Sequence, residues 1–163
     1  MEERRMGPEE EGVVVHIIED DEGIRRALER FLNDPSYELG RSATTFEEAM
    51  GLIGQVEREI REGDRRERVF LLDANLKRGA VAGLEGRVIS HKLRMMRNEL
   101  KSSGISAVIG IIGIALNEME MGAEVDGNFT KREMSSSIDK PNPGGDLLVL
   151  ISSVLEEISS GTR

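Results

Sequence analysis

Acidic side chains stand directly after two apolar runs of this sequence, where they are well placed to do chemistry. Glu19 and Asp20 follow the run Val13–Ile18, and Asp73 follows the shorter run Val69–Leu72. If the two runs are neighbouring parallel strands, their carboxyl ends meet at one edge of a sheet and the carboxylates converge there. Like charges held so close are unfavourable unless a proton or a cation neutralises them. Because Mg²⁺ prefers oxygen ligands, the pattern predicts a magnesium site.

A carboxylate in such a site also suits phosphoryl chemistry. Carboxylates act as nucleophiles towards phosphoryl groups, and a lysine that reaches the phosphoryl oxygens neutralises the charge that develops on them. A magnesium-dependent hydrolase would need a second acid two residues after Asp73, but Asn75 stands there, so we rank that function last. His16 lies inside an apolar run, which favours a packed core residue over a ligand.

The elements that must position these acids alternate between strands and helices along the chain. β-Branched runs are typical of buried strands, and apolar residues at helical spacing indicate amphipathic helices. We predict strands at 13–18, 37–43, 69–72, 105–114 and 137–140, and helices over about 24–32, 46–60, 84–100 and 147–158. Thr45 and Glu48 predict a capping box at the start of the second helix. This alternation is typical of an α/β fold with a doubly wound parallel sheet and helices on both faces.

Composition narrows the class of protein. The chain has 163 residues, a formal net charge of −9, one tyrosine, four phenylalanines and no tryptophan or cysteine. The negative charge disfavours nucleic-acid binding, and no apolar run approaches the length of a membrane span. We therefore expect a cytoplasmic protein that binds neither nucleic acid nor membrane. We expect one domain at 13–158, between a mobile acidic tail at 1–12 and a short tail at 159–163.

Three motifs, in this order, resemble the CheY-like receiver domain of two-component response regulators. Residues 13–25 resemble the family's first strand, acidic pair and first helix start, and Phe70–Leu76 resembles its third strand with the phospho-accepting aspartate at the tip. Lys140-Pro141, seven residues before Leu147, is similar to the family's fifth-strand Lys-Pro. The resemblance extends from about Val13 to Ile158.

The resemblance implies a flavodoxin-like fold, with a five-stranded parallel sheet in the order 2-1-3-4-5 and five helices. It also implies that Asp73 is the phosphorylation site and that Lys140 pairs with the phosphoryl group. Glu19, Asp20 and Asp73 would then hold Mg²⁺ together with the backbone carbonyl of Asn75. The expected role is a stand-alone phosphorelay receiver, a signalling protein rather than an enzyme. Its phosphate would come from a sensor histidine kinase or a phosphotransfer protein, and its output would be a downstream protein partner.

The site lysine has two candidates. Lys131 competes with Lys140, because Gly122-Ala123 precedes it roughly as in the family. We prefer Lys140, because Pro141 and the register of the last helix both agree with it.

Other positions depart from the family pattern. No serine or threonine occurs in 108–116, where the family has a hydroxyl at the end of the fourth strand. With Lys140 as the site lysine, Ser137 or Ile138 replaces the expected aromatic switch residue. These departures support an alternative function, a pseudo-receiver that binds proteins or dimerises independently of phosphorylation. Under either function, the sequence does not decide whether the protein forms a homodimer.

Overall fold

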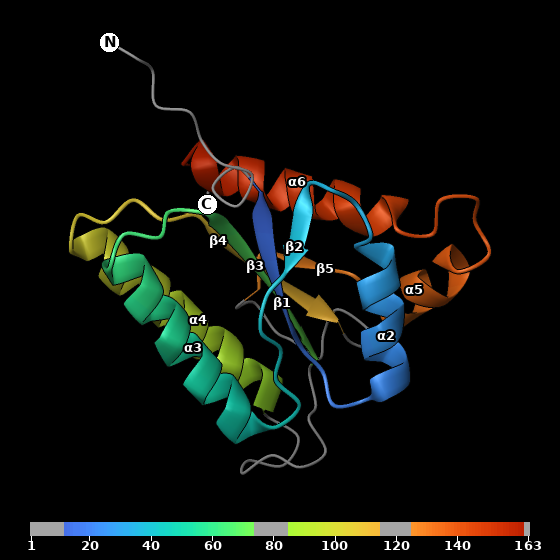
Figure 1. Ribbon diagram of the computed structural model, residues 1–163, viewed down its shortest axis with the longest axis horizontal. Coiled ribbons are helices and arrows are strands. Elements are labelled where there is room, and N and C mark those ends of the chain that lie inside the picture. The colour runs from blue at the N-terminus through green and yellow to red at the C-terminus, as the bar shows by residue number, and fades with distance from the viewer. Residues whose placement is uncertain (1–11, 74–84, 115–124, 162–163) are drawn as a thin grey trace.

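Five parallel strands form one sheet in the order β2-β1-β3-β4-β5 (Figure 1). The computed structural model describes residues 12–73, 85–114 and 125–161. The strands are β1 (Val13–Ile18), β2 (Tyr37–Leu39), β3 (Glu67–Asp73), β4 (Ile109–Ile114) and β5 (Gly127–Asn128). The predicted α/β class, the five parallel strands and their order are confirmed.

Helices cover both faces of the sheet (Figure 1). They are α2 (Glu22–Phe31), α3 (Phe46–Arg61), α4 (Glu85–Ser102), α5 (Lys131–Ser137) and α6 (Gly145–Ser159). Helices α3 and α4 bury their apolar sides against one face, and α2, α5 and α6 against the other. None of these described helices combines the length and the apolar character needed to cross a lipid bilayer.

The central strands are apolar on both sides because each side packs against helices. In β1, Val15 and Ile17 contact the core beneath α2 and α6, while Ile18 contacts the core beneath α3 and α4. Neighbouring β3 pairs with β1 in register, so that Ile18 lies opposite Leu72. A continuous apolar run is the pattern expected of such a doubly covered parallel strand.

Local hydrogen bonds decide where the helices begin. Asp21 caps α2 by accepting the backbone N–H of Ile24. Thr45 caps α3 by accepting from the N–H of Glu48, but the Glu48 side chain accepts from the N–H of Thr44 rather than of Thr45. The predicted capping box is therefore only half formed at this helix.

The C-terminal third differs from the prediction. The strand predicted at 137–140 is wrong: Ser137 ends α5, and β5 lies ten residues earlier, at Gly127–Asn128. The predicted first and third helices, over about 24–32 and 84–100, agree with α2 and α4 to within two residues at each end. The sequence also favours a loop at 77–83 and a short or irregular helix near 116–121, and both segments fall outside the described residues.

Two strands are shorter than predicted. β2 stops at Leu39, although Gly40 and Ala43 still donate backbone hydrogen bonds to β1. β4 begins at Ile109 rather than at Ile105, because the N–H of Ile105 bonds the carbonyl of Leu100 and closes the end of α4.

Candidate functional site

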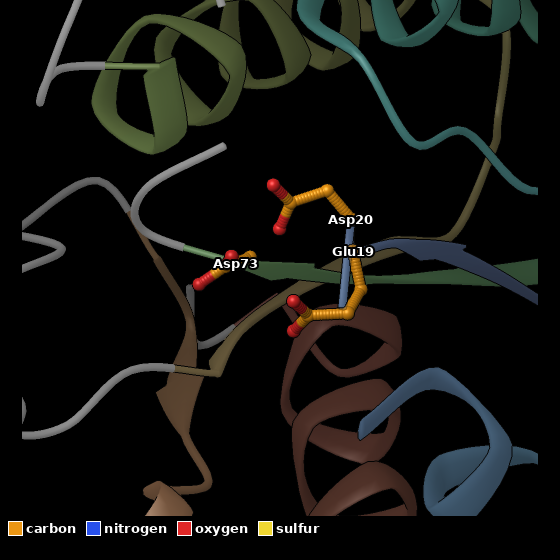
Figure 2. Close-up of side chains that lie close together, drawn as sticks. All are labelled: Glu19, Asp20 and Asp73. Carbon is orange, nitrogen blue, oxygen red and sulfur yellow. The ribbon is translucent and has the colours of Figure 1, made fainter. Parts of the chain in front are cut away.

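The tips of β1 and β3 bring the predicted acids together. Glu19 and Asp73 are 1% and 4% exposed, and Asp20 is half-buried beside them. Each of the three offers a carboxylate oxygen that lies within 4.8 Å of the other two. Glu19 and Asp20 leave the end of β1 and turn their carboxyl groups to the side on which Asp73 lies (Figure 2). The predicted convergence is therefore present.

Backbone hydrogen bonds hold the Glu19 end of this acidic cluster. The N–H of Glu19 donates to the carbonyl of Ala43 at 3.0 Å, which ties the tip of β1 to the segment after β2. Glu19 Oε2 accepts the N–H of Asp21 at 3.2 Å. The other oxygen, Oε1, is buried and has no hydrogen-bond partner among the described residues. A buried acceptor without a donor is unfavourable, so a proton or a cation at Oε1 would stabilise the cluster.

The electrostatics of the acidic cluster favour neutralisation. Burial, followed by the negative charge of Asp73, raises the pKa of Glu19 to about 8. The Asp21 N–H and the positive charge of Lys131 act in the opposite direction and lower this pKa. Glu19 therefore holds a proton at neutral pH unless a cation takes the proton's place.

The lysine beside Asp73 is Lys131. Its Nζ lies 3.5 Å from Oδ1 of Asp73, and its side chain is 28% exposed. Lys140 instead forms an exposed ion pair with Asp146, at 2.5 Å. The structure therefore places Lys131, and not the preferred Lys140, beside Asp73, because Lys131 follows β5 at the sheet edge that carries Asp73.

A capping box at the start of α5 positions Lys131, and the sequence alone predicts this capping box. Thr130 accepts the N–H of Glu133, and Glu133 returns its carboxylate to the N–H of Thr130. The pattern Thr-x-x-Glu is a helix-start pattern. Applied at Thr130, this pattern would have predicted a helix that begins at Lys131, with Lys131 in its first turn and Ser137, the first residue of the predicted strand, in its last.

Of the two residues that the resemblance implies for relaying activation, the hydroxyl is replaced and the aromatic residue is present. Ile114, buried at the end of β4, lies opposite Asp73 in the register, so no hydroxyl side chain stands there. The expectation that no aromatic residue precedes the lysine was made for Lys140. With Lys131 beside Asp73, an aromatic residue does precede the lysine. It is Phe129, 1% exposed, whose ring packs edge-on against Phe31 with centroids 6.4 Å apart.

The acidic cluster fits the magnesium predicted from the sequence. Its donors are carboxylate oxygens, the ligand type that Mg²⁺ prefers, and the buried Oε1 of Glu19 is an acceptor that a cation would satisfy in place of a proton. Asn75, predicted to add a backbone carbonyl, lies outside the described residues.

Solved structures of receiver domains have a similar backbone. The signal receiver domain of the response regulator NarL from Mycobacterium tuberculosis aligns with a TM-score of 0.50 and 16% identity, covering 86% of this chain and 96% of that one. RcsB from Salmonella enterica serovar Typhimurium, bound to promoter P1flhDC in the presence of the phosphomimetic BeF₃⁻, aligns with a TM-score of 0.51 and 13% identity, covering 93% and 68%. No protein-family model and no curated protein matches the sequence. The chain has the CheY-like fold of response-regulator receiver domains.

Proposed function

We propose that this protein is a phosphorelay receiver that accepts a phosphoryl group on Asp73. The observation that carries the proposal is the buried cluster of Glu19, Asp20 and Asp73 with Lys131 Nζ at 3.5 Å from Asp73. A nucleophilic carboxylate, an oxygen-rich cation site and a lysine next to the nucleophile are the groups that phosphoryl transfer to aspartate needs.

Each side chain has a distinct task in the transfer. A carboxylate oxygen of Asp73 attacks the phosphorus atom of the donor and forms a new O–P bond. The P–N bond of the donor's phosphohistidine breaks, and its electron pair stays on the imidazole. Lys131 neutralises negative charge on the phosphoryl oxygens. Glu19, Asp20 and Asp73 would hold Mg²⁺, which when bound supplies positive charge to the phosphoryl oxygens.

The test is covalent labelling with a small phosphodonor. The protein is incubated with acetyl phosphate in the presence of Mg²⁺, and intact mass is measured. We expect the added mass of one phosphoryl group in the wild type and none in Asp73→Asn. Asp139→Asn, a substitution at an exposed aspartate after α5, serves as the matched control and should be labelled like the wild type.

Two results would contradict the proposal. One is an unchanged wild-type mass under conditions that label a known receiver. The other is equal labelling of Asp73→Asn, which would place the modification elsewhere. Omission of Mg²⁺, with EDTA added, should abolish labelling if the acidic cluster holds the cation.

A second function, a protein-binding module that works independently of phosphorylation, is supported by Ile114. This apolar residue stands opposite Asp73 where a relaying hydroxyl is expected. Under this alternative, thermal unfolding of the wild type and of Asp73→Asn would be equally insensitive to Mg²⁺. Stabilisation of the wild type alone by Mg²⁺ would count against it.

A further inference from the structure

A second polar site lies on the same two central strands, away from the acidic cluster. A cavity of about 200 Å³ opens between α3, β1 and the segment that follows β2. Its walls include His16, Arg41, Arg66, Arg68, Glu38 and Glu59. Arg68 stands five residues before Asp73 in β3, which separates the two sites by roughly 17 Å along the strand.

Arg68 is the most buried charged group in the wall of this cavity. Its side chain is 1% exposed. The Nη2 group donates to Glu59 at 3.1 Å and to Asp64 at 2.7 Å, and Nη1 lies 3.0 Å from Nε2 of His16. Nε is buried and has no acceptor in the described part of the chain. Arg68 therefore has one donor still to satisfy.

The partners of His16 determine its tautomer. A guanidinium can only donate, so Nε2 of His16 must accept from Arg68. The proton then sits on Nδ1, which donates to the carbonyl of Arg41 at 2.9 Å. Burial is the main cause that lowers the pKa of His16 to about 4, so the ring is neutral and adds no charge to the cavity.

The ring of His16 cannot move away from this arrangement. It stacks on Phe70, with centroids 4.8 Å apart. On its other side is Gly40, where a Cβ atom would lie 2.6 Å from the ring. Only glycine leaves room for the imidazole at that point, so the inner wall of the cavity is preorganised.

Donors exceed acceptors around the cavity. The Arg41 side chain is 62% exposed, and the Glu59 carboxylate oxygen beside its guanidinium is 3.8 Å away, beyond hydrogen-bond distance. The oxygens of Glu59 already accept from Arg68 and Gln55. One oxygen of Glu38 accepts from Arg66. Arg66 is fully paired, with Glu38 and with Asp64, so the unmatched donors of the wall are Nε of Arg68 and the guanidinium of Arg41.

We propose that this cavity binds a small oxyanion of the carboxylate or phosphate type. Such a ligand supplies acceptors for Nε of Arg68 and for the guanidinium of Arg41, and planar guanidinium donors match these anions well. The volume equals that of several water molecules, so it admits an anion of the size of acetate or phosphate. Asp64, which lies outside the cavity wall, pairs with Arg66 and Arg68 and holds both in place. Arg41 has no such partner within hydrogen-bond distance among the residues that the structure describes, so its exposed side chain can turn towards the anion.

The test is an NMR titration of the full chain with sodium phosphate and, separately, with sodium acetate. Sodium chloride at the same ionic strength is the control. We expect saturable shifts of the Arg68 Nε–H and the Gly40 amide signals with at least one oxyanion and not with chloride. The oxyanion that saturates identifies the ligand class. Arg41→Gln should weaken binding about tenfold, while Arg61→Gln, which changes an α3 arginine paired with Glu57, should leave affinity unchanged.

Several outcomes would overturn the site. These are the absence of saturable shifts with either oxyanion, shifts of equal size with chloride, or an Arg41→Gln affinity equal to that of the wild type. Because Arg41 is exposed, its replacement leaves the buried network intact and the variant remains interpretable. Asp73→Asn should bind the anion as the wild type does, which separates this site from the acidic cluster.

Discussion

Arg97 of α4 binds both carboxylate oxygens of Asp126, the residue that precedes β5, at 2.8 and 3.2 Å. Asp126 also accepts the backbone N–H of Ile111 in β4 at 2.8 Å, and its side chain is 3% exposed. This junction fastens the two-residue strand β5, and with it Lys131, to the rest of the sheet. The position of Lys131 therefore depends on an ion pair between a helix and a loop.

Replacing Asp126 with alanine should strongly destabilise the protein. The change removes the carboxylate that accepts from Arg97 and from the Ile111 N–H, although Arg97 still donates to the carbonyl of Ile109. The expected loss is about 3–5 kcal/mol. Chemical denaturation measures it. The control is Asp146→Ala, which breaks the exposed pair with Lys140 and should cost far less, because solvent screens exposed ion pairs. Equal losses in the two variants would show that the junction does not hold β5.

The two candidate lysines should differ in their effect on labelling of Asp73. Lys131→Ala removes the cation beside the acceptor and should slow phosphorylation by a small phosphodonor about 100-fold. Lys140→Ala removes a cation that pairs with Asp146 instead and should leave the rate unchanged. Initial rates from intact mass decide between them. A larger effect of Lys140→Ala would reinstate the sequence-based preference.

Glu19 should make the metal-free protein less stable as pH rises. Its pKa in the fold is about 8 against 4.5 for the free group, so the folded state binds the proton more tightly than the unfolded chain. The contribution of this proton to the free energy of unfolding is complete below pH 4.5 and is lost as pH rises towards 8. The total loss is at most about 5 kcal/mol. Glu19→Gln should remove this slope in denaturation measured with EDTA, while Glu47→Gln, at an exposed acid of α3, should retain it.

The response of stability to Mg²⁺ provides a second test of Glu19, this time as a ligand of the cation. Addition of the cation at pH 8 should restore stability to the wild type but less so to Glu19→Gln, because the variant lacks one carboxylate ligand. An identical response of both proteins would exclude Glu19 from the cation site.

His16 should make the protein less stable as pH falls, the opposite of the effect of Glu19. Its pKa in the fold is about 4 against 6.5, so the unfolded chain binds the proton more tightly than the folded state. The stability present above pH 6.5 is lost as pH falls towards 4, by about 3 kcal/mol. His16→Gln should lack this loss and His91→Gln, on the exposed side of α4, should keep it. Because Glu19 and His16 oppose each other between pH 4.5 and 6.5, each effect is read as the difference between wild type and variant.

Gly144 should tolerate no side chain. An added Cβ atom would clash with the backbone carbonyl of Phe31 at the end of α2, and that backbone cannot move without unwinding the helix. We expect Gly144→Ala to destabilise the protein by roughly 1–3 kcal/mol in thermal or chemical unfolding. Gly51→Ala in α3, where a Cβ atom meets nothing within 4 Å, should instead stabilise it by about 1 kcal/mol. Similar effects of the two changes would mean that α2 and the loop before α6 are not in close contact.

Much of the site was predictable because its information is local. Glu19, Asp20 and Asp73 follow apolar runs, and parallel strands always present their carboxyl ends on the same edge. The main error concerned β5. Gly127–Asn128 has no apolar pattern of its own, and the Lys140-Pro141 pair offered a more familiar motif. The capping pattern at Thr130 is equally local. It indicates which lysine lies beside Asp73 only if the short strand before it, Gly127–Asn128, is also recognised.

The order of apolar runs, helical stripes and acids along the chain was sufficient to determine the layered fold and the acidic edge, because burial on both faces of a parallel sheet selects such runs. Only the tertiary structure decided which lysine meets Asp73, because β5 is held by contacts with Ile111 and Arg97, which are distant in sequence. It alone also joined His16, Arg41 and Arg68 around one cavity. Their spacing in the chain carries no periodic pattern, and only strand pairing and the packing of α3 make them neighbours.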